Sequence, residues 1–228
     1  VTGVQTCALP ICAFEKCTSL ANITIPNTVS KIDVKAFFGC SSLKNVIIPN
    51  TITKINNSTF NGCKSLTNIS IPESVKEIGR SAFSHCSSLT NIIIPNGVSK
   101  IAEFAFSFCS SLTNIIIPNG VTKIDNSTFN WCKSLSSVTI PESVKEIGRN
   151  AFFFCSSLTN VIIPNGVTKI GISAFYGCES LENVTIPDSV TEICESALCY
   201  CSPSLKLTIP KSVIELGKNA LPNKQTTT

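Results

Sequence analysis

The chain has 228 residues, of which 43% are hydrophobic and 14% charged, and its formal net charge at pH 7 is +4. Such a small and evenly spread positive charge argues against nucleic-acid binding. No apolar run reaches the roughly 18 residues that a membrane-spanning helix needs, so we expect no direct membrane insertion by this segment.

Cysteine and proline each recur at intervals of 23 residues, in nine copies. The cysteine column consists of Cys17, Cys40, Cys63, Cys86, Cys109, Cys132, Cys155, Cys178 and Cys201. A phenylalanine stands three positions before each cysteine except in the ninth copy, which has Leu198. A unit of this length is too short to fold alone, but stacked copies can bury one another's apolar edges. The period therefore predicts a single elongated repeat solenoid.

The first 11 residues lie outside this register. They resemble the in-frame translation of a short-read sequencing adapter, so we expect a non-native leader there. The chain contains no methionine, and its first recognisable repeat, Ala13–Cys17, begins partway through a unit, so we expect a fragment. We thus expect a leader over 1–11, a repeat solenoid over 12–221 and a polar tail over 222–228.

Within each unit, alternating apolar residues predict a short strand. In the second copy we expect Val46 and Ile48 to face inward and Ile47 outward, because successive strand residues point to opposite sides. A proline then ends the strand, since it lacks a backbone donor. The later Val98 and Ile101 of the fourth copy predict further inward contacts, and an Ala-Phe-x-x-Cys turn fills the corner.

The fourth copy reads Ala82-Phe83-x-x-Cys86-x-x-Leu89-x-x-Ile92-x-Ile94-Pro95. This pattern resembles the BspA-like leucine-rich-repeat family, from Ala13 to about Leu221. The resemblance implies an array of about nine units, with short parallel strands and a convex side of turns or short helices. The family is associated with surface proteins of host-associated bacteria and parasitic protists, some of which look like adhesins.

Thirteen cysteines raise the alternatives of a disulfide framework or a metal site. Cysteines on neighbouring rungs would have parallel Cβ atoms about 4.8 Å apart, beyond the usual separation of about 3.5–4.5 Å in a disulfide. We therefore predict that the cysteine column is a row of buried thiols. A local disulfide or metal site stays open for Cys194, Cys199 and Cys201, although they lack the C-x2-C pairs or histidines of a zinc site. We expect no metal and no cofactor.

Catalytic constellations are absent from the sequence. The single histidine is His85, and no long insertion between repeats could bring a nucleophile, a base and an oxyanion donor together. We therefore expect no enzyme. Lysine and glutamate alternate in part of one column, as in Lys54, Glu77 and Lys100, and we expect a solvated face with ion pairs between rungs.

Two outward-facing repeat columns carry apolar or ring side chains in place of polar ones. The outward strand position carries isoleucine in four copies, and the position before each cysteine carries ring side chains in four consecutive copies. These candidates for partner binding are Ile47, Ile93, Ile116, Ile162, His85, Phe108, Trp131 and Phe154. Exposed apolar patches and aromatic side chains are typical of interaction sites. The alternative is that the rings lie flat over the convex turns and shield the backbone.

The sequence thus favours a non-enzymatic protein-binding module. The resemblance places it in a cell-surface or secreted, adhesin-like protein whose partner is a protein of the host or of a cell surface. An intracellular scaffold in the cytoplasm is the alternative that unpaired cysteines fit equally well. A passive surface stalk, which needs no ligand, is the third possibility.

Overall fold

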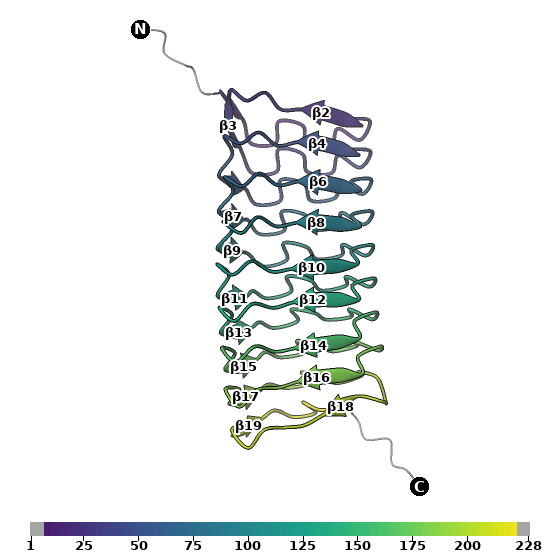
Figure 1. Ribbon diagram of the computed structural model, residues 1–228. Coiled ribbons are helices and arrows are strands. Elements are labelled where there is room, and N and C mark those ends of the chain that lie inside the picture. The colour runs from purple at the N-terminus through teal and green to yellow at the C-terminus, as the bar shows by residue number, and fades with distance from the viewer. Residues whose placement is uncertain (1–6, 223–228) are drawn as a thin grey trace.

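The computed structural model describes residues 7–222, and this range contains strands and turns but no helix. Figure 1 shows the strands as two rows that run the length of a straight solenoid, with the two termini at opposite ends. All pairings between strands are parallel, and equivalent residues of successive units pair, as Ile23 does with Val46. The predicted solenoid of parallel strands is confirmed.

The first row forms one face of the solenoid. It consists of β2 (Asn22–Thr24), β4 (Asn45–Ile47), β6 (Asn68–Ser70), β8 (Asn91–Ile93), β10 (Asn114–Ile116), β12 (Ser137–Thr139), β14 (Asn160–Ile162), β16 (Asn183–Thr185) and β18 (Lys206–Leu207). The expected alternation is confirmed, because Val46 and Ile48 are each 5% exposed and Ile47 is 63% exposed.

The second row follows the proline of each unit. It consists of β3 (Val29–Ile32), β5 (Lys54–Ile55), β7 (Glu77–Ile78), β9 (Lys100–Ile101), β11 (Lys123–Ile124), β13 (Glu146–Ile147), β15 (Lys169–Ile170), β17 (Glu192–Ile193) and β19 (Glu215–Leu216). Each of these strands from β3 to β17 directs an isoleucine into the core and a lysine or glutamate toward solvent.

The rest of each unit is built from turns. Two positions per unit adopt a positive φ, for example Ser81 at 53° and His85 at 59° in the fourth unit. A left-handed residue interrupts the right-handed backbone that a helix requires. Of the two expected forms of the convex side, the structure therefore has turns.

The core is a column of phenylalanine rings. From Phe14 to Phe175, one ring per unit stacks on the next with centroids 5.2–5.5 Å apart and planes within 10°. The rings from Phe37 to Phe175 are fully buried, and Leu198 replaces the ring in the ninth unit. Each buried ring contributes about 3 kcal/mol of transfer free energy before entropy is subtracted.

The cysteine column lies beside these rings. Each thiol from Cys40 to Cys201 donates a hydrogen bond to the carbonyl of the residue 26 positions earlier, which is the core phenylalanine of the preceding unit. The position therefore needs a side chain that is small, apolar and still able to donate. Burial raises the pKa of Cys109 to about 12, so the thiol stays protonated.

The predicted burial is confirmed for the eight column members from Cys40 onward and is wrong for Cys17, which is exposed. Cys17 belongs to the first rung of the described chain, and its outer side has no complete rung stacked on it. Of the three irregular cysteines, Cys199 is buried and Cys194 is partly buried, and both are free thiols.

The expected leader and tail lie only partly within the described range. Residues 1–6 and 223–228 fall outside it. Residues Cys7–Leu9 form β1, which pairs with β3, and Leu9 packs against the core. The assignment of residues 1–11 to a non-native leader stays a prediction.

Candidate functional site

The position before each column cysteine adopts a left-handed backbone in every rung. Its φ is 71° at Gly39, 77° at Gly62 and 71° at Gly177, and it is 59° at Phe108 and 60° at Trp131. Glycine adopts this conformation without strain, whereas another residue pays on the order of 1–2 kcal/mol. The chain therefore places bulky rings at a position where three of its five other rungs use glycine, the remaining two having Lys16 and Tyr200.

Four of these positions form a continuous aromatic seam, defined as His85, Phe108, Trp131 and Phe154. Their ring centroids are 4.5, 5.9 and 4.5 Å apart in that order, with planes within 12°. The structure thus brings together all four aromatic candidates that the sequence singled out. Stacking contributes about 0.5–1.5 kcal/mol per pair, which is comparable to the backbone strain, so the main gain in stability over glycine is the partial burial of the rings.

The four side chains of the seam are only partly covered by the rest of the chain. His85 is exposed, Phe108 is 38% exposed, and Trp131 and Phe154 are partly buried. The ring of Phe154 fills the space above the next rung, where a Cβ on Gly177 would lie 2.9 Å from the Phe154 ring. The rings therefore cover one another's faces, and their edges point outward. Because these edges stay accessible, the alternative that the rings only shield the backbone explains just part of their surface.

A second row of rings widens the seam toward the C-terminus. Phe153 contacts Trp131 edge-on at 6.3 Å, and Tyr176 stacks on Phe153 at 5.1 Å. Tyr200, which stands in the same repeat column as the seam residues, lies 5.1 Å from Tyr176. Tyr176 was not among the candidates predicted from the sequence, although it shares a repeat column with Phe153 and an alignment of the units places the two rings on successive rungs.

The electrostatics of the seam are mild. Burial and then the nearby Lys64 lower the pKa of His85, so the imidazole is neutral at pH 7. The ammonium of Lys133 lies 5.1 Å from the Trp131 ring centroid. The seam is thus a strip of uncharged rings flanked by two lysines.

The isoleucine candidates lie on the other face, in the first row of strands. We call Ile47, Ile93, Ile116 and Ile162 the isoleucine face; their exposed fractions are 63, 76, 68 and 73%. Ile93 and Ile116 are on the adjacent strands β8 and β10. A parallel column of exposed asparagines runs beside them, in which Asn45 donates to Asn22 and Asn183 donates to Asn160.

The second row of strands carries the ion pairs expected from its sequence. Glu77 lies 3.0 Å from Lys54 and 3.4 Å from Lys100. Burial alone would raise the pKa of Glu77, but hydrogen bonds and charge from the two lysines lower it overall. These are partly exposed pairs, so their contribution to stability is small.

We expect Glu77→Gln to lower the free energy of unfolding at pH 7 by about 0.5–1 kcal/mol. Because the carboxyl pKa is lower in the folded chain than in the unfolded one, its contribution is present above the unfolded pKa and is lost as the pH falls through the folded pKa. Urea unfolding of both proteins between pH 7 and pH 3 measures the difference. A gap between wild type and variant that persists at the acid end would contradict the ion-pair assignment.

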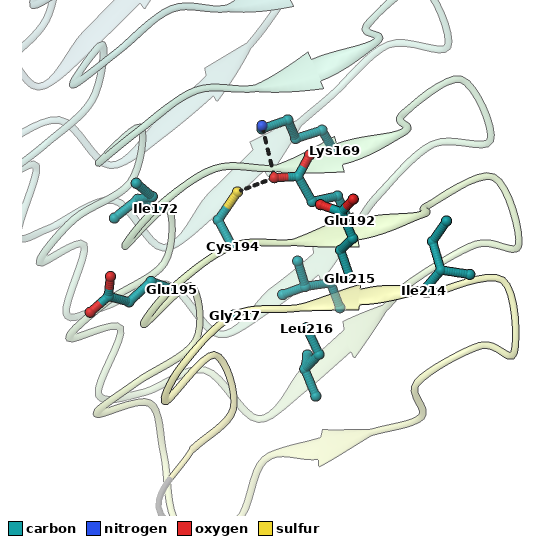
Figure 2. Close-up of a pocket in the computed structure, with 10 residues that line it drawn as sticks. Lys169, Ile172, Glu192, Cys194, Glu195, Ile214, Glu215, Leu216 and Gly217 are labelled. Atoms are coloured by element: carbon teal, nitrogen blue, oxygen red, sulfur yellow. Dashed lines mark hydrogen bonds and ion pairs between the residues drawn. The ribbon is translucent and has the colours of Figure 1, made fainter.

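An open hollow lies beside β17 and β19. Figure 2 shows that Lys169 and Cys194 both contact Glu192. Lys169 Nζ lies 2.8 Å and Cys194 Sγ 3.0 Å from the same carboxylate oxygen. Burial, followed by the hydrogen bond to Glu192, raises the pKa of Cys194 to about 11. A nucleophilic cysteine needs a lowered pKa, so this thiol is not activated for catalysis.

Residues 7–222 contain no group of three histidine, cysteine or acidic side chains arranged to hold a metal ion. In the same range, no helix is long and apolar enough to cross a membrane.

Comparisons with known proteins match the repeat region. A family model described as "BspA type Leucine rich repeat region (6 copies)" matches residues 8–135 and 122–228. No curated protein matches the chain. Among solved structures, a leucine-rich repeat protein from Bacteroides ovatus is 25% identical with a TM-score of 0.62, over 93% of this chain and 67% of that one.

Two further structures are similar. A leucine rich cell surface protein from Faecalibacterium prausnitzii is 27% identical with a TM-score of 0.57, over 90% of this chain and 79% of that one. A leucine-rich repeat protein from Eubacterium ventriosum has a TM-score of 0.67 at 22% identity, over 90% of this chain and 59% of that one, and shows the fold alone.

Proposed function

Because the chain belongs to the BspA-type leucine-rich repeat family, we propose that it is a non-enzymatic protein-binding module of a cell-surface or secreted, adhesin-like protein. The aromatic seam is its docking surface, and the partner is a protein of a host or cell surface. The similarity to a structure described as a leucine rich cell surface protein supports the location.

The observation that carries this proposal is the use of strained backbone positions for rings. Gly39, Gly62 and Gly177 show that the fold closes its turns without any side chain at this position. Stacking roughly offsets the strain, and the rings are only partly buried, so their contribution to stability is smaller than that of the core phenylalanines. Residues held in unfavourable backbone conformations cluster at functional sites, and aromatic side chains dominate binding hot spots.

The geometry also indicates what kind of partner fits. The seam rings stack with planes nearly parallel, so their faces are covered and their edges, which carry partial positive charge, point outward. Ring edges contact the faces of other aromatic rings in the edge-to-face arrangement. A protein segment that supplies aromatic side chains therefore suits the seam better than a sugar, which needs open ring faces.

We expect Trp131→Gly to weaken partner binding by about 5- to 150-fold, the usual effect of removing a ring hot spot. The probe is a set of peptides selected for binding to the wild-type chain from a random displayed library. Because Trp131 is the single tryptophan of the chain, its fluorescence reports peptide binding to the wild type directly. Binding to the variant is measured by interferometry.

Ile172→Ser is the control, since Ile172 is 36% exposed and lies outside the seam. Circular dichroism should show both variants folded, because glycine already occupies the equivalent position in three other rungs. Selected peptides that bind Trp131→Gly and wild type equally would overturn the assignment of the seam, and a library that yields no binder would favour a passive stalk.

A further inference from the structure

The second row of strands has one carbonyl per rung that accepts a hydrogen bond from the next rung. In six rungs the donor is the backbone N–H of the residue directly after the strand. Ala102 thus donates to Ile78 at 2.9 Å, and Gly148 donates to Ile124 at 2.8 Å. Because buried backbone carbonyls are nearly always paired, each rung of this column needs such a donor.

Two rungs carry a larger polar residue at the donor position, Asn56 and Asp125, which are three units apart. At Asn56 the side-chain Nδ2 replaces the backbone donor and lies 2.7 Å from the carbonyl oxygen of Ile32. A carboxylate only accepts hydrogen bonds, so Asp125 cannot do the same for Ile101. Within residues 7–222, no group donates to the Ile101 carbonyl, and β9 and β11 are unpaired although β7 pairs with β9 and β11 with β13.

Both acceptors are shielded from water. Ile101 is 3% exposed, and the partly buried side chain of Asp125 has no hydrogen bond or ion pair with any residue of the described range. Burial is the main influence on the Asp125 carboxyl and raises its pKa, although Lys123 and Lys100 lower it. Both lysines are already paired with a glutamate of a neighbouring rung. By equivalence with Asn56 and Ile32, the carboxyl and the carbonyl face each other between β9 and β11 without a donor.

We propose that the Asp125 carboxylate and the Ile101 carbonyl bind a primary ammonium group, carried by a lysine side chain of a partner protein or by a small amine. An ammonium group has three N–H donors and no acceptor, so it can serve both oxygens at once. A calcium ion takes about six to eight oxygen ligands, which these two groups do not supply. The site lies on the second row of strands and not in the aromatic seam, so it goes beyond the proposed function and does not depend on it.

The surroundings of Asp125 leave room for such a group. A second hollow, of about 450 Å³, lies against it and is also lined by Ala102 and Glu103. The other two acids of this hollow, Glu77 and Glu103, already have ion-pair partners at 3.0 and 3.4 Å. Among the residues that line the hollow, Asp125 is therefore the acid that is available to an incoming cation.

Nuclear magnetic resonance of the whole isotope-labelled chain at about pH 8 tests the site, with n-butylammonium chloride as the probe. We expect saturable shifts of the Asp125 and Ala102 amide signals at millimolar concentrations. Tetramethylammonium chloride carries the same charge but no N–H donor, so it should cause no saturable shift. A parallel titration with acetyl-Gly-Lys-Gly-amide distinguishes the two sources. Binding at least as tight as that of the amine indicates a protein lysine, and weaker binding indicates a small amine.

Asp125→Asn supplies the amide that Asn56 already provides in its own rung. The variant should lose butylammonium binding and should melt about 2–4 °C higher than wild type, because its amide can donate to Ile101. Asp33→Asn is the matched control, since Asp33 occupies the same column but its backbone N–H donates to Leu9 at 3.0 Å. This control should bind butylammonium like wild type.

The proposal is overturned if butylammonium causes no saturable shift, if tetramethylammonium shifts the same signals equally, or if Asp125→Asn binds the amine as well as wild type does. A melting temperature of Asp125→Asn below that of wild type would also contradict it, because the Ile101 carbonyl would then already have a donor.

Discussion

Phe106→Ala should lower the free energy of unfolding by about 3–5 kcal/mol, while Phe108→Gly, two residues away, should lower it by only about 1–2 kcal/mol. Phe106 is fully buried between Phe83 and Phe129, at centroid distances of 5.4 and 5.5 Å. Removing its ring leaves a cavity that neighbouring rungs cannot close, because their spacing is fixed by backbone hydrogen bonds above and below.

The ring of Phe108 differs from that of Phe106 because it is partly exposed and sits on a left-handed backbone. Phe108→Gly loses two stacking contacts and the burial of part of the ring, but it relieves a left-handed backbone with φ of 59°, so the net loss should be smaller than for Phe106→Ala. Urea unfolding followed by circular dichroism measures both variants against wild type. Equal losses for the two variants would show that the seam is part of the structural core, and the shielding interpretation would then replace the docking surface.

Much of the fold could be predicted from the sequence because the same pattern of apolar residues repeats in every unit. A period of 23 residues with fixed apolar columns leaves few ways to bury Phe83, Cys86 and Ile92 in every unit. Strand alternation then predicts that Ile47 lies on the surface, as the structure shows. The exception, Cys17, follows from the same logic, since a column position is buried only where rungs cover both of its sides.

Only part of the candidate site could be predicted from the sequence. The repeat columns placed His85, Phe108, Trp131 and Phe154 next to one another, and the structure stacks them. Their left-handed backbone was not predicted, because glycines in the same column are compatible with several turn types. The direction in which each ring leans depends on space that Gly177 leaves open, and such space is a property of packing between rungs rather than of local sequence.

The two candidate surfaces differ in the backbone conformation on which their side chains sit. The isoleucine face sits on unstrained strands, where Thr24 or Thr185 serves equally well for folding. Its pattern is therefore free to be set by a partner of matching shape. The aromatic seam instead occupies positions that favour glycine, so each of its rings carries a local cost. Backbone strain therefore supports partner binding at the aromatic seam and says nothing of the isoleucine face.

Deleting residues 47–69, one whole unit of 23 residues, should give a shorter but well-folded solenoid. The deletion joins Val46 to Ser70, which pairs with Ile47 at the equivalent position of the next strand. It brings Lys31 into the place of Lys54 opposite Glu77, so the ion pair can form again. The aromatic seam, which begins at His85, stays complete.

A half-unit deletion of residues 47–58 should be far more damaging, although it removes fewer residues. The rung would lack β5 and the inward Ile48, Ile52 and Ile55, all at most 5% exposed, and the chain could not wrap around the core. Stability in repeat arrays is a sum of unit and neighbour terms, so a whole unit costs one increment while a broken rung removes the contacts on both of its sides. Thermal unfolding by circular dichroism should show one cooperative transition, a few degrees lower, for the 47–69 deletion. The 47–58 deletion should lose cooperativity or melt much earlier, and a half-unit deletion as stable as the whole-unit one would contradict the interlocking register on which the fold rests.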